Sequence, residues 1–154
     1  MNWKPLDTPR AVETFVEHFG GFHDAYLKEF HFLAPGSLNE TSFGLNCDDK
    51  PLLRMYFQGS PKAVELLFVG NIRMSLLESP AWSWYEQIDE ARIYYQDNLV
   101  IWTTELHLDC REELDTREPW IAASKCFWKE VDWTGNRLRY LDPGLEVLQD
   151  QDLG

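Results

Sequence analysis

The clearest helical period of apolar residues in the chain lies near its start. The apolar stripe follows the i, i+3, i+4, i+7 pattern and consists of Val12, Phe15, Val16 and Phe19. Thr8-Pro9 supplies a capping side chain and a proline for the first helical position, and Gly20-Gly21 suits a helix end. The pattern predicts a short amphipathic helix from Pro9 to Phe19.

Most of the remaining apolar residues alternate with polar ones, as in half-buried strands. Phe22 to Leu33 fits a helix at some positions, but its aromatic content and the preceding glycines favour a strand. Leu53 to Phe57 and Ala63 to Leu77 read as strands. One face of the second is formed by Val64, Leu66, Phe68, Ile72, Met74 and Leu76. Gly70 lies in the same phase, and we expect a bulge or a close backbone approach there rather than a break.

The best hairpin signal is Asp97-Asn98, two residues that tolerate the left-handed conformation of a tight turn. It lies between Ala91 to Gln96 and Leu99 to Leu108, and both segments are predicted strands. Trp120 to Val131 reads as a last long strand, in which the tryptophans are mainly core residues. A turn at 134–136 and a short apolar segment at 138–141 complete the pattern.

Short turns between strands favour antiparallel pairing, because parallel strands need long crossovers. The predicted fold is α+β, mostly antiparallel β-sheet in one sheet or two packed sheets, with a short N-terminal helix. No linker divides the chain, so we expect a single domain over 1–141 and an acidic, mobile tail over 142–154.

Charge changes this picture of an ordinary β-rich domain. The chain has 26 Asp and Glu against 14 Lys and Arg, a net charge of −12, yet 44% of its residues are hydrophobic. Such apolar content supplies a core, so the chain is folded rather than disordered. A strongly negative surface repels phosphate backbones and anionic lipids, which argues against nucleic acid or membrane partners and favours a basic protein partner.

The cysteines and the N-terminus indicate a cytoplasmic protein. Cys47, Cys110 and Cys126 are an odd number at spacings that match neither a disulfide framework nor a zinc site, so we expect reduced thiols. The first residues lack the apolar core of a signal peptide, and no apolar stretch is long enough to span a membrane. No cofactor or metal is expected.

Candidate chemistry is limited to two places where a histidine lies near an aspartate. His23 adjoins Asp24, and His107 lies two residues before Asp109, on the same side of an extended chain. These four residues could build a small metal site or a hydrolase site, although so acidic a chain also produces such neighbours by chance. His18, near the end of the predicted helix, suits a structural role beside the helix dipole.

Enzyme motifs are missing, and an aromatic cluster remains as a candidate binding surface. There is no nucleophile elbow, phosphate loop or dinucleotide turn, so a catalytic role is open but not favoured. Trp82, Trp84 and Tyr85 follow Ser79-Pro80 in a loop-like setting. Large amphipathic rings in such a setting serve either as interface anchors or as a satellite of the core.

The Phe-His-Asp-Ala stretch within Gly20 to Ala25, followed by the alternating pattern of Val64 to Leu77, resembles a group of small bacterial proteins. Some members of that group are immunity proteins of polymorphic toxin systems. The resemblance implies a partner-binding role, which the acidic charge favours independently because nuclease toxins are basic. The expected function is therefore an immunity-like module acting on a basic protein. The His-Asp site and a homodimeric structural domain stay open as alternatives.

Overall fold

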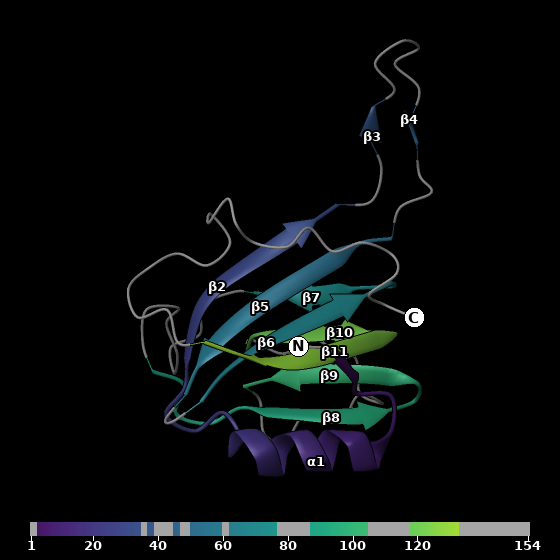
Figure 1. Cartoon of the computed structure of the whole chain (residues 1–154). Coiled ribbons are helices and arrows are strands. Elements are labelled where there is room, and N and C mark those ends of the chain that lie inside the picture. The colour runs from purple at the N-terminus through teal and green to yellow at the C-terminus, as the bar shows by residue number, and fades with distance from the viewer. Residues whose placement is uncertain are drawn as a thin grey trace.

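The structure of the protein is a computed structural model that describes residues 3–34, 37–38, 45–46, 50–59, 62–76, 87–104 and 118–132. Among these residues lie one helix, α1 (Pro9–Phe19), and the strands β1 (Lys4–Pro5), β2 (Tyr26–Leu33), β3 (Ser37–Leu38), β4 (Leu45–Asn46), β5 (Leu52–Gln58), β6 (Ala63–Val69), β7 (Arg73–Ser75), β8 (Arg92–Gln96), β9 (Leu99–Thr103), β10 (Trp120–Ala123) and β11 (Lys125–Val131). The predicted bounds of the helix are confirmed, and so is the mostly antiparallel α+β fold (Figure 1).

Two antiparallel sheets form the body of the molecule. The larger sheet has the order β1-β11-β6-β5-β2, and the smaller has the order β7-β10-β9-β8. The short pair β3 and β4 stands away from this body (Figure 1). The helix α1 lies beside β8, at the end of the molecule opposite to β3 and β4.

Two segments that the sequence predicted as single long strands instead bend and pass from one sheet to the other. Ala63 to Leu77 divides into β6 in the larger sheet and β7 in the smaller one, so the expectation of an unbroken strand was wrong. Trp120 to Val131 divides in the same way into β10 and β11. Sheets that share bent strands at a corner are typical of orthogonal packing.

The corner depends on a backbone conformation at Gly70 that side chains disfavour. Gly70 and Asn71 have φ values of 69° and 45°, in the left-handed region. Ser124 lies at the other bend, between β10 and β11. Its hydroxyl donates to the carbonyls of Val69 and Gly70 at 3.3 and 3.1 Å. The predicted close approach at Gly70 is therefore correct, but it accompanies a break in the strand rather than a bulge.

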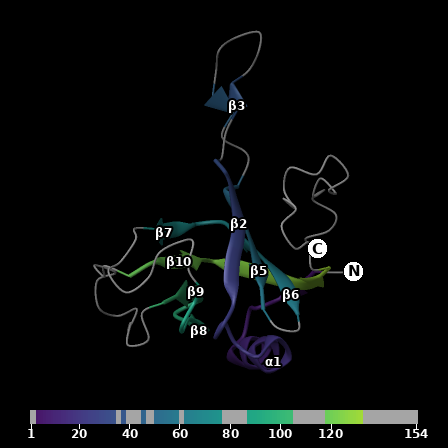
Figure 2. The ribbon, with the colours of Figure 1, turned by 90° about the vertical axis from the view of Figure 1, so that its left-hand side faces the viewer.

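An aromatic cluster joins the helix to both sheets. Phe15 of α1 packs at 5.1 Å from Trp128 and 6.0 Å from Phe22, measured between ring centroids. Phe22 in turn contacts Phe57 and Trp102, which come from different sheets. An isolated bridge between Ala25 and Ile88 ties the start of β2 to the segment before β8. This bridge links the two sheets between β2 and β8, and α1 covers the lower end of the body (Figure 2).

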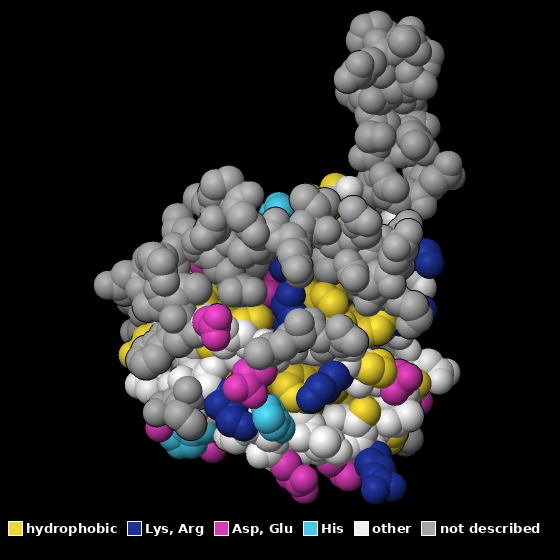
Figure 3. Space-filling model, in the orientation of Figure 1, with side chains coloured by type: hydrophobic (Ala, Val, Ile, Leu, Met, Phe, Trp, Pro, Cys, Tyr) yellow, Lys and Arg dark blue, Asp and Glu magenta, His cyan; other side chains and the backbone are white. Residues whose placement is uncertain are grey.

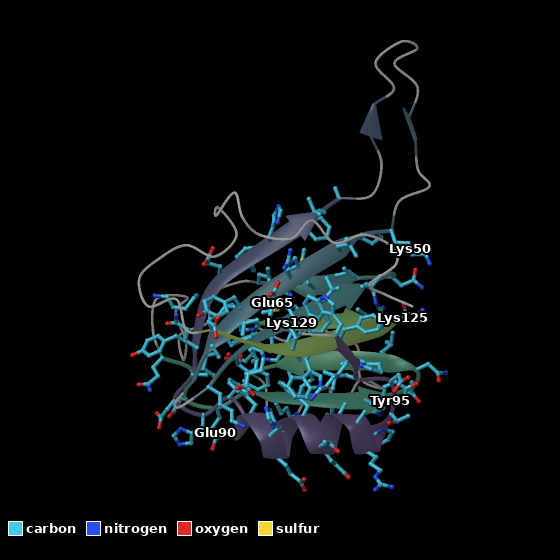
Figure 4. The ribbon with its side chains drawn as sticks, in the orientation of Figure 1. Lys50, Glu65, Glu90, Tyr95, Lys125 and Lys129 are labelled. Carbon is cyan, nitrogen blue, oxygen red and sulfur yellow. The ribbon has the colours of Figure 1, made fainter. Side chains whose placement is uncertain are left out.

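Both faces of the central strands β5 and β6 are buried, including charged residues on the face turned away from the aromatic core. Glu65 is fully buried and accepts from the Arg54 guanidinium at 2.5 Å, while the Lys129 ammonium lies 3.8 Å from its other oxygen. Figure 4 shows Glu65 and Lys129 side by side on neighbouring strands. Buried charges need such pairing, because desolvation of a lone ion costs several kcal/mol.

The remaining predictions divide between confirmed ones and ones outside the described residues. The strand preference for Phe22 to Leu33 is confirmed from Tyr26 onward, and the hairpin at Asp97-Asn98 is confirmed with both turn residues at positive φ.

Cys126 is a buried free thiol as predicted, and burial raises its pKa well above the ordinary value. Cys47, Cys110, the turn at 134–136 and the tail at 142–154 lie outside the described residues. No helix among the described residues has the length and apolarity needed to cross a membrane.

Candidate functional site

The best candidate for a binding site is a groove of about 360 Å³ between α1 and β8. Its lining residues are Pro9, Val12, Glu13, Val16, Glu17, Ile93, Tyr94 and Tyr95. We call this the α1–β8 groove. Val12 and Ile93 are buried and form its floor, whereas Val16 and the two tyrosines are half-buried. The floor is therefore apolar and the tyrosines offer the amphipathic rings that interfaces favour.

Local sequence signals fix the helical wall of the groove. The Thr8 hydroxyl accepts from the amide of Ala11 at 3.1 Å, which caps the start of α1 beside Pro9. Gly20 ends the helix in the left-handed conformation. Between these ends, the buried side of the helix is held by the aromatic core, so the neighbouring positions at Val16 and Glu17 are presented to the groove.

The other wall is the edge of β8, the last strand in the order of the smaller sheet. Three consecutive residues, 93–95, line the groove, although successive strand residues point to opposite faces. The groove therefore runs along the backbone edge of β8 rather than over one face. The Arg92 guanidinium lies 4.6 Å from the Tyr94 ring centroid, and the Tyr95 hydroxyl donates to the Asn98 side chain at 3.3 Å. Figure 4 shows Tyr95 near the turn that ends β8.

Negative charge lies along the helical rim. Glu13 and Glu17 line the groove, are exposed and stand four residues apart, which places them on one side of the helix. Figure 3 shows acidic side chains along the lower edge of the molecule, where α1 lies, together with a Lys or Arg side chain at one end of that edge. An apolar floor with a carboxylate rim suits a ligand that combines an aliphatic stem with a positive end, as Lys and Arg do.

The residues predicted from sequence as a metal or hydrolase site are only partly placed. His23 and Asp24 lie in the turn between α1 and β2, with 3.3 Å between Nδ1 and Oδ2 and with side chains 65% and 67% exposed. His107 and Asp109 lie outside the described residues, as do Trp82, Trp84 and Tyr85. Among the residues with described positions, no three His, Cys, Asp or Glu side chains are close enough to hold a metal ion.

His18 lies in the last turn of α1 as predicted, but its side chain pairs with the larger sheet, and it is Lys62 that meets the end of the helix. The Nε2 of His18 lies 2.6 Å from a Glu130 carboxylate oxygen on β11. Lys62 donates to the His18 carbonyl at 2.9 Å and so meets the end of the helix. The hydrogen bond from His18, aided by the positive charges of Lys62, His18 and Lys4, lowers the pKa of Glu130 from its ordinary value. This cluster anchors the end of α1 to the larger sheet.

Sequence reasoning missed the groove because no single segment contains it. Val12 and Val16 were recognised only as a core-facing stripe, and Tyr94 and Tyr95 only as part of a strand. A usable signal existed in Glu13 and Glu17, which repeat one helical turn apart beside two valines. What the sequence lacked was the placement of that helix face against the β8 edge.

Comparison with known proteins gives no relative from which a function could be transferred. No protein-family model, curated protein or solved structure matches the chain.

Proposed function

We propose that this protein is a protein-binding module that holds a basic partner at the α1–β8 groove. The observation that carries the proposal is the pairing of an apolar floor with the carboxylates of Glu13 and Glu17. The net charge of −12 supports it, because a field of that sign attracts a basic partner before contact. The resemblance to immunity proteins adds a finer proposal, in which the partner is a basic toxin that binding inactivates.

Crosslinking followed by affinity measurement tests the proposal. A photoreactive amino acid at Val16 should trap the partner from a lysate of the source cell, and mass spectrometry should identify it as a basic protein. With the purified partner, the double variant Glu13→Gln and Glu17→Gln should weaken binding by about three- to thirtyfold, since exposed ion pairs contribute up to about 1 kcal/mol each.

Asp132→Asn is the matched control. It removes one negative carboxylate charge, as each glutamine substitution does, but from an exposed position directly after β11. The affinity should therefore stay almost unchanged. An acidic partner, or an affinity that the double variant leaves at the wild-type level, would contradict the proposal. If the trapped protein is an enzyme that acts on nucleic acid, loss of its activity on binding would support the immunity-like role.

A second candidate function, homodimerisation, is favoured by the edge strand β2. The exposed large hydrophobic side chains of the described residues all lie on it: Tyr26, Phe30, Phe32 and Leu33, at 38–49% exposure. Lys28 and Glu29 are neighbours at the irregularity of β2, so a two-fold axis at this point would bring Lys28 of each copy near Glu29 of the other. Sedimentation velocity should then show a dimer that Phe32→Lys dissociates, and a monomer at every concentration would exclude it.

A further inference from the structure

The backbone of β8 indicates how a partner would be held in the α1–β8 groove. Asp97-Asn98 forms a two-residue turn, so the flanking residues Gln96 and Leu99 form a hydrogen-bonded pair. Hydrogen-bonded pairs recur at every second residue, which makes Tyr94 opposite Ile101 the next such pair. The amide and carbonyl groups of the intervening residues, Ile93 and Tyr95, therefore point away from β9.

These outward-pointing backbone groups face the groove. The helix α1 lies below β8 in Figure 1, on the side away from β9, and Figure 2 shows that it is also displaced toward the larger sheet; Ile93 and Tyr95 line the space between α1 and β8. No described strand pairs with β8 on this side. A peptide that adds to a sheet edge needs free backbone donors and acceptors for affinity and pockets for alternate side chains for specificity. The edge of β8 offers the first, and the neighbouring side chains of α1 offer the second.

The spacing of the acidic residues matches that of an added strand. Glu17 lies four positions after Glu13 in α1, a rise of about 6 Å. Side chains on one face of a strand repeat every 6.6 to 6.8 Å, which is roughly the same distance. The axis of α1 runs along β8 in Figure 1, so the two repeats lie side by side. Two basic residues separated by one residue would reach both carboxylates, with their aliphatic stems over Val12 and Val16.

We infer that the partner enters the groove as an extended segment that adds to the edge of β8 and presents basic side chains at alternate positions to Glu13 and Glu17. This inference rests on the proposed function and names the form of the ligand: an extended basic segment of a protein. A folded basic surface that made only side-chain contacts would not use the backbone groups of Ile93 and Tyr95.

Labelled peptides of about seven residues, the length of an ordinary strand, test this with the full chain in fluorescence anisotropy. The first has two arginines separated by one threonine in a threonine background, and the second has the same composition with the arginines adjacent. Adjacent side chains point to opposite faces of a strand, so only one arginine of the second peptide reaches the glutamates. The alternating peptide should bind at least about threefold more tightly.

Backbone methylation tests the strand pairing directly. Alternate amides of an extended peptide point to one edge, so N-methylation at the arginines and at the intervening threonines blocks opposite edges. One of these two methylated peptides should lose binding and the other should keep it. Equal affinity of the two methylated peptides, or of the alternating and adjacent peptides, would overturn strand addition.

The outcomes separate this inference from the function on which it rests. If alternating and adjacent peptides bind equally and both weaken at Glu13→Gln and Glu17→Gln but not at Asp132→Asn, the groove binds basic partners by another mode. If neither peptide binds while the partner trapped at Val16 still binds and weakens in the double variant, only strand addition is overturned. If the double variant also leaves the affinity for that partner unchanged, both the inference and the proposed function are overturned.

Discussion

At the scale of single residues, the fold depends on one glycine at the point where two strands leave one sheet for the other. Gly70 combines a φ of 69° with a neighbour so close that an added Cβ would lie 2.9 Å from the Ser124 hydroxyl. Left-handed backbone costs a side chain roughly 1–2 kcal/mol, and displacing Ser124 would also weaken its bonds to two carbonyls. Gly70→Ala should therefore lower the free energy of unfolding by more than about 2 kcal/mol in chemical denaturation.

The variant Gly20→Ala measures the cost of left-handed strain alone, and its comparison with Gly70→Ala shows how much crowding adds at the corner. Gly20 has a φ of 85°, but a Cβ there would meet no atom within 4 Å. It should therefore lose only the strain contribution, about 1 kcal/mol. Equal losses in the two variants would mean that the contact with Ser124 does not stabilise the corner.

The Glu130 carboxylate should make stability depend on pH at the acid end. Its folded pKa is lowered from an ordinary value of about 4.5, mainly by the hydrogen bond from His18. Between these two pKa values the unfolded chain binds more protons, so stability rises with pH there. The contribution is fully present above about pH 4.5 and is lost as the pH falls through the folded pKa.

Comparison of the wild type with Glu130→Gln across this range measures the effect. The difference between their unfolding free energies should be larger just above the ordinary carboxyl pKa than in more acidic solution, where it should shrink steadily. Asp132→Asn gives the background for loss of a nearby exposed charge. A difference that grew on acidification would show that His18 does not favour the ionised carboxylate.

At the scale of elements, sequence reasoning succeeded where a single segment carries the whole signal. The stripe and caps of α1 lie within a few residues of one another, and so do the turn residues of the β8–β9 hairpin. The alternation of apolar and polar residues correctly predicted which side chains of β6 face the core, but it could not show that the strand ends at Val69. The phase of apolar residues continues through the corner, because Ile72 and Met74 on the far side pack against the same core.

Core truncations on the two sides of the corner test how much burial differs between β6 and the segment that leads into β7. Phe68 in β6 is fully buried, whereas Ile72, just before β7, is only partly buried. Phe68→Ala should cost about 3–5 kcal/mol of unfolding free energy, and Ile72→Ala less than about 2 kcal/mol. Equal costs in denaturant titrations would favour the continuous strand that the sequence suggested.

The candidate site was less predictable than the fold for the same physical reason. The groove joins α1 to β8, and the two are separated by more than seventy residues in the chain. Local periodicity marks Val16 and Tyr95 as half-buried positions on their own elements, but it contains no information about which elements become neighbours. That placement follows from the aromatic core, where Phe15 and Phe22 meet side chains of both sheets.

At the scale of the whole molecule, charge should act on the rate of association, and contacts in the groove should act on dissociation. The net charge of −12 creates a field that reaches beyond the groove, but salt screens it over about 8 Å at physiological ionic strength and about 3 Å at 1 M. Stopped-flow binding of a basic peptide should therefore slow steeply as salt rises, while the dissociation rate changes little.

Variants separate this long-range effect from contact. Asp132→Asn should reduce the association rate slightly at low salt and leave dissociation alone, because its charge contributes only to the field. Val16→Ala should leave association unchanged and speed dissociation, because it removes apolar contact from the groove without altering charge. If association were insensitive to salt, the acidic composition would have no part in partner capture, and binding would have to depend on the shape of the groove alone.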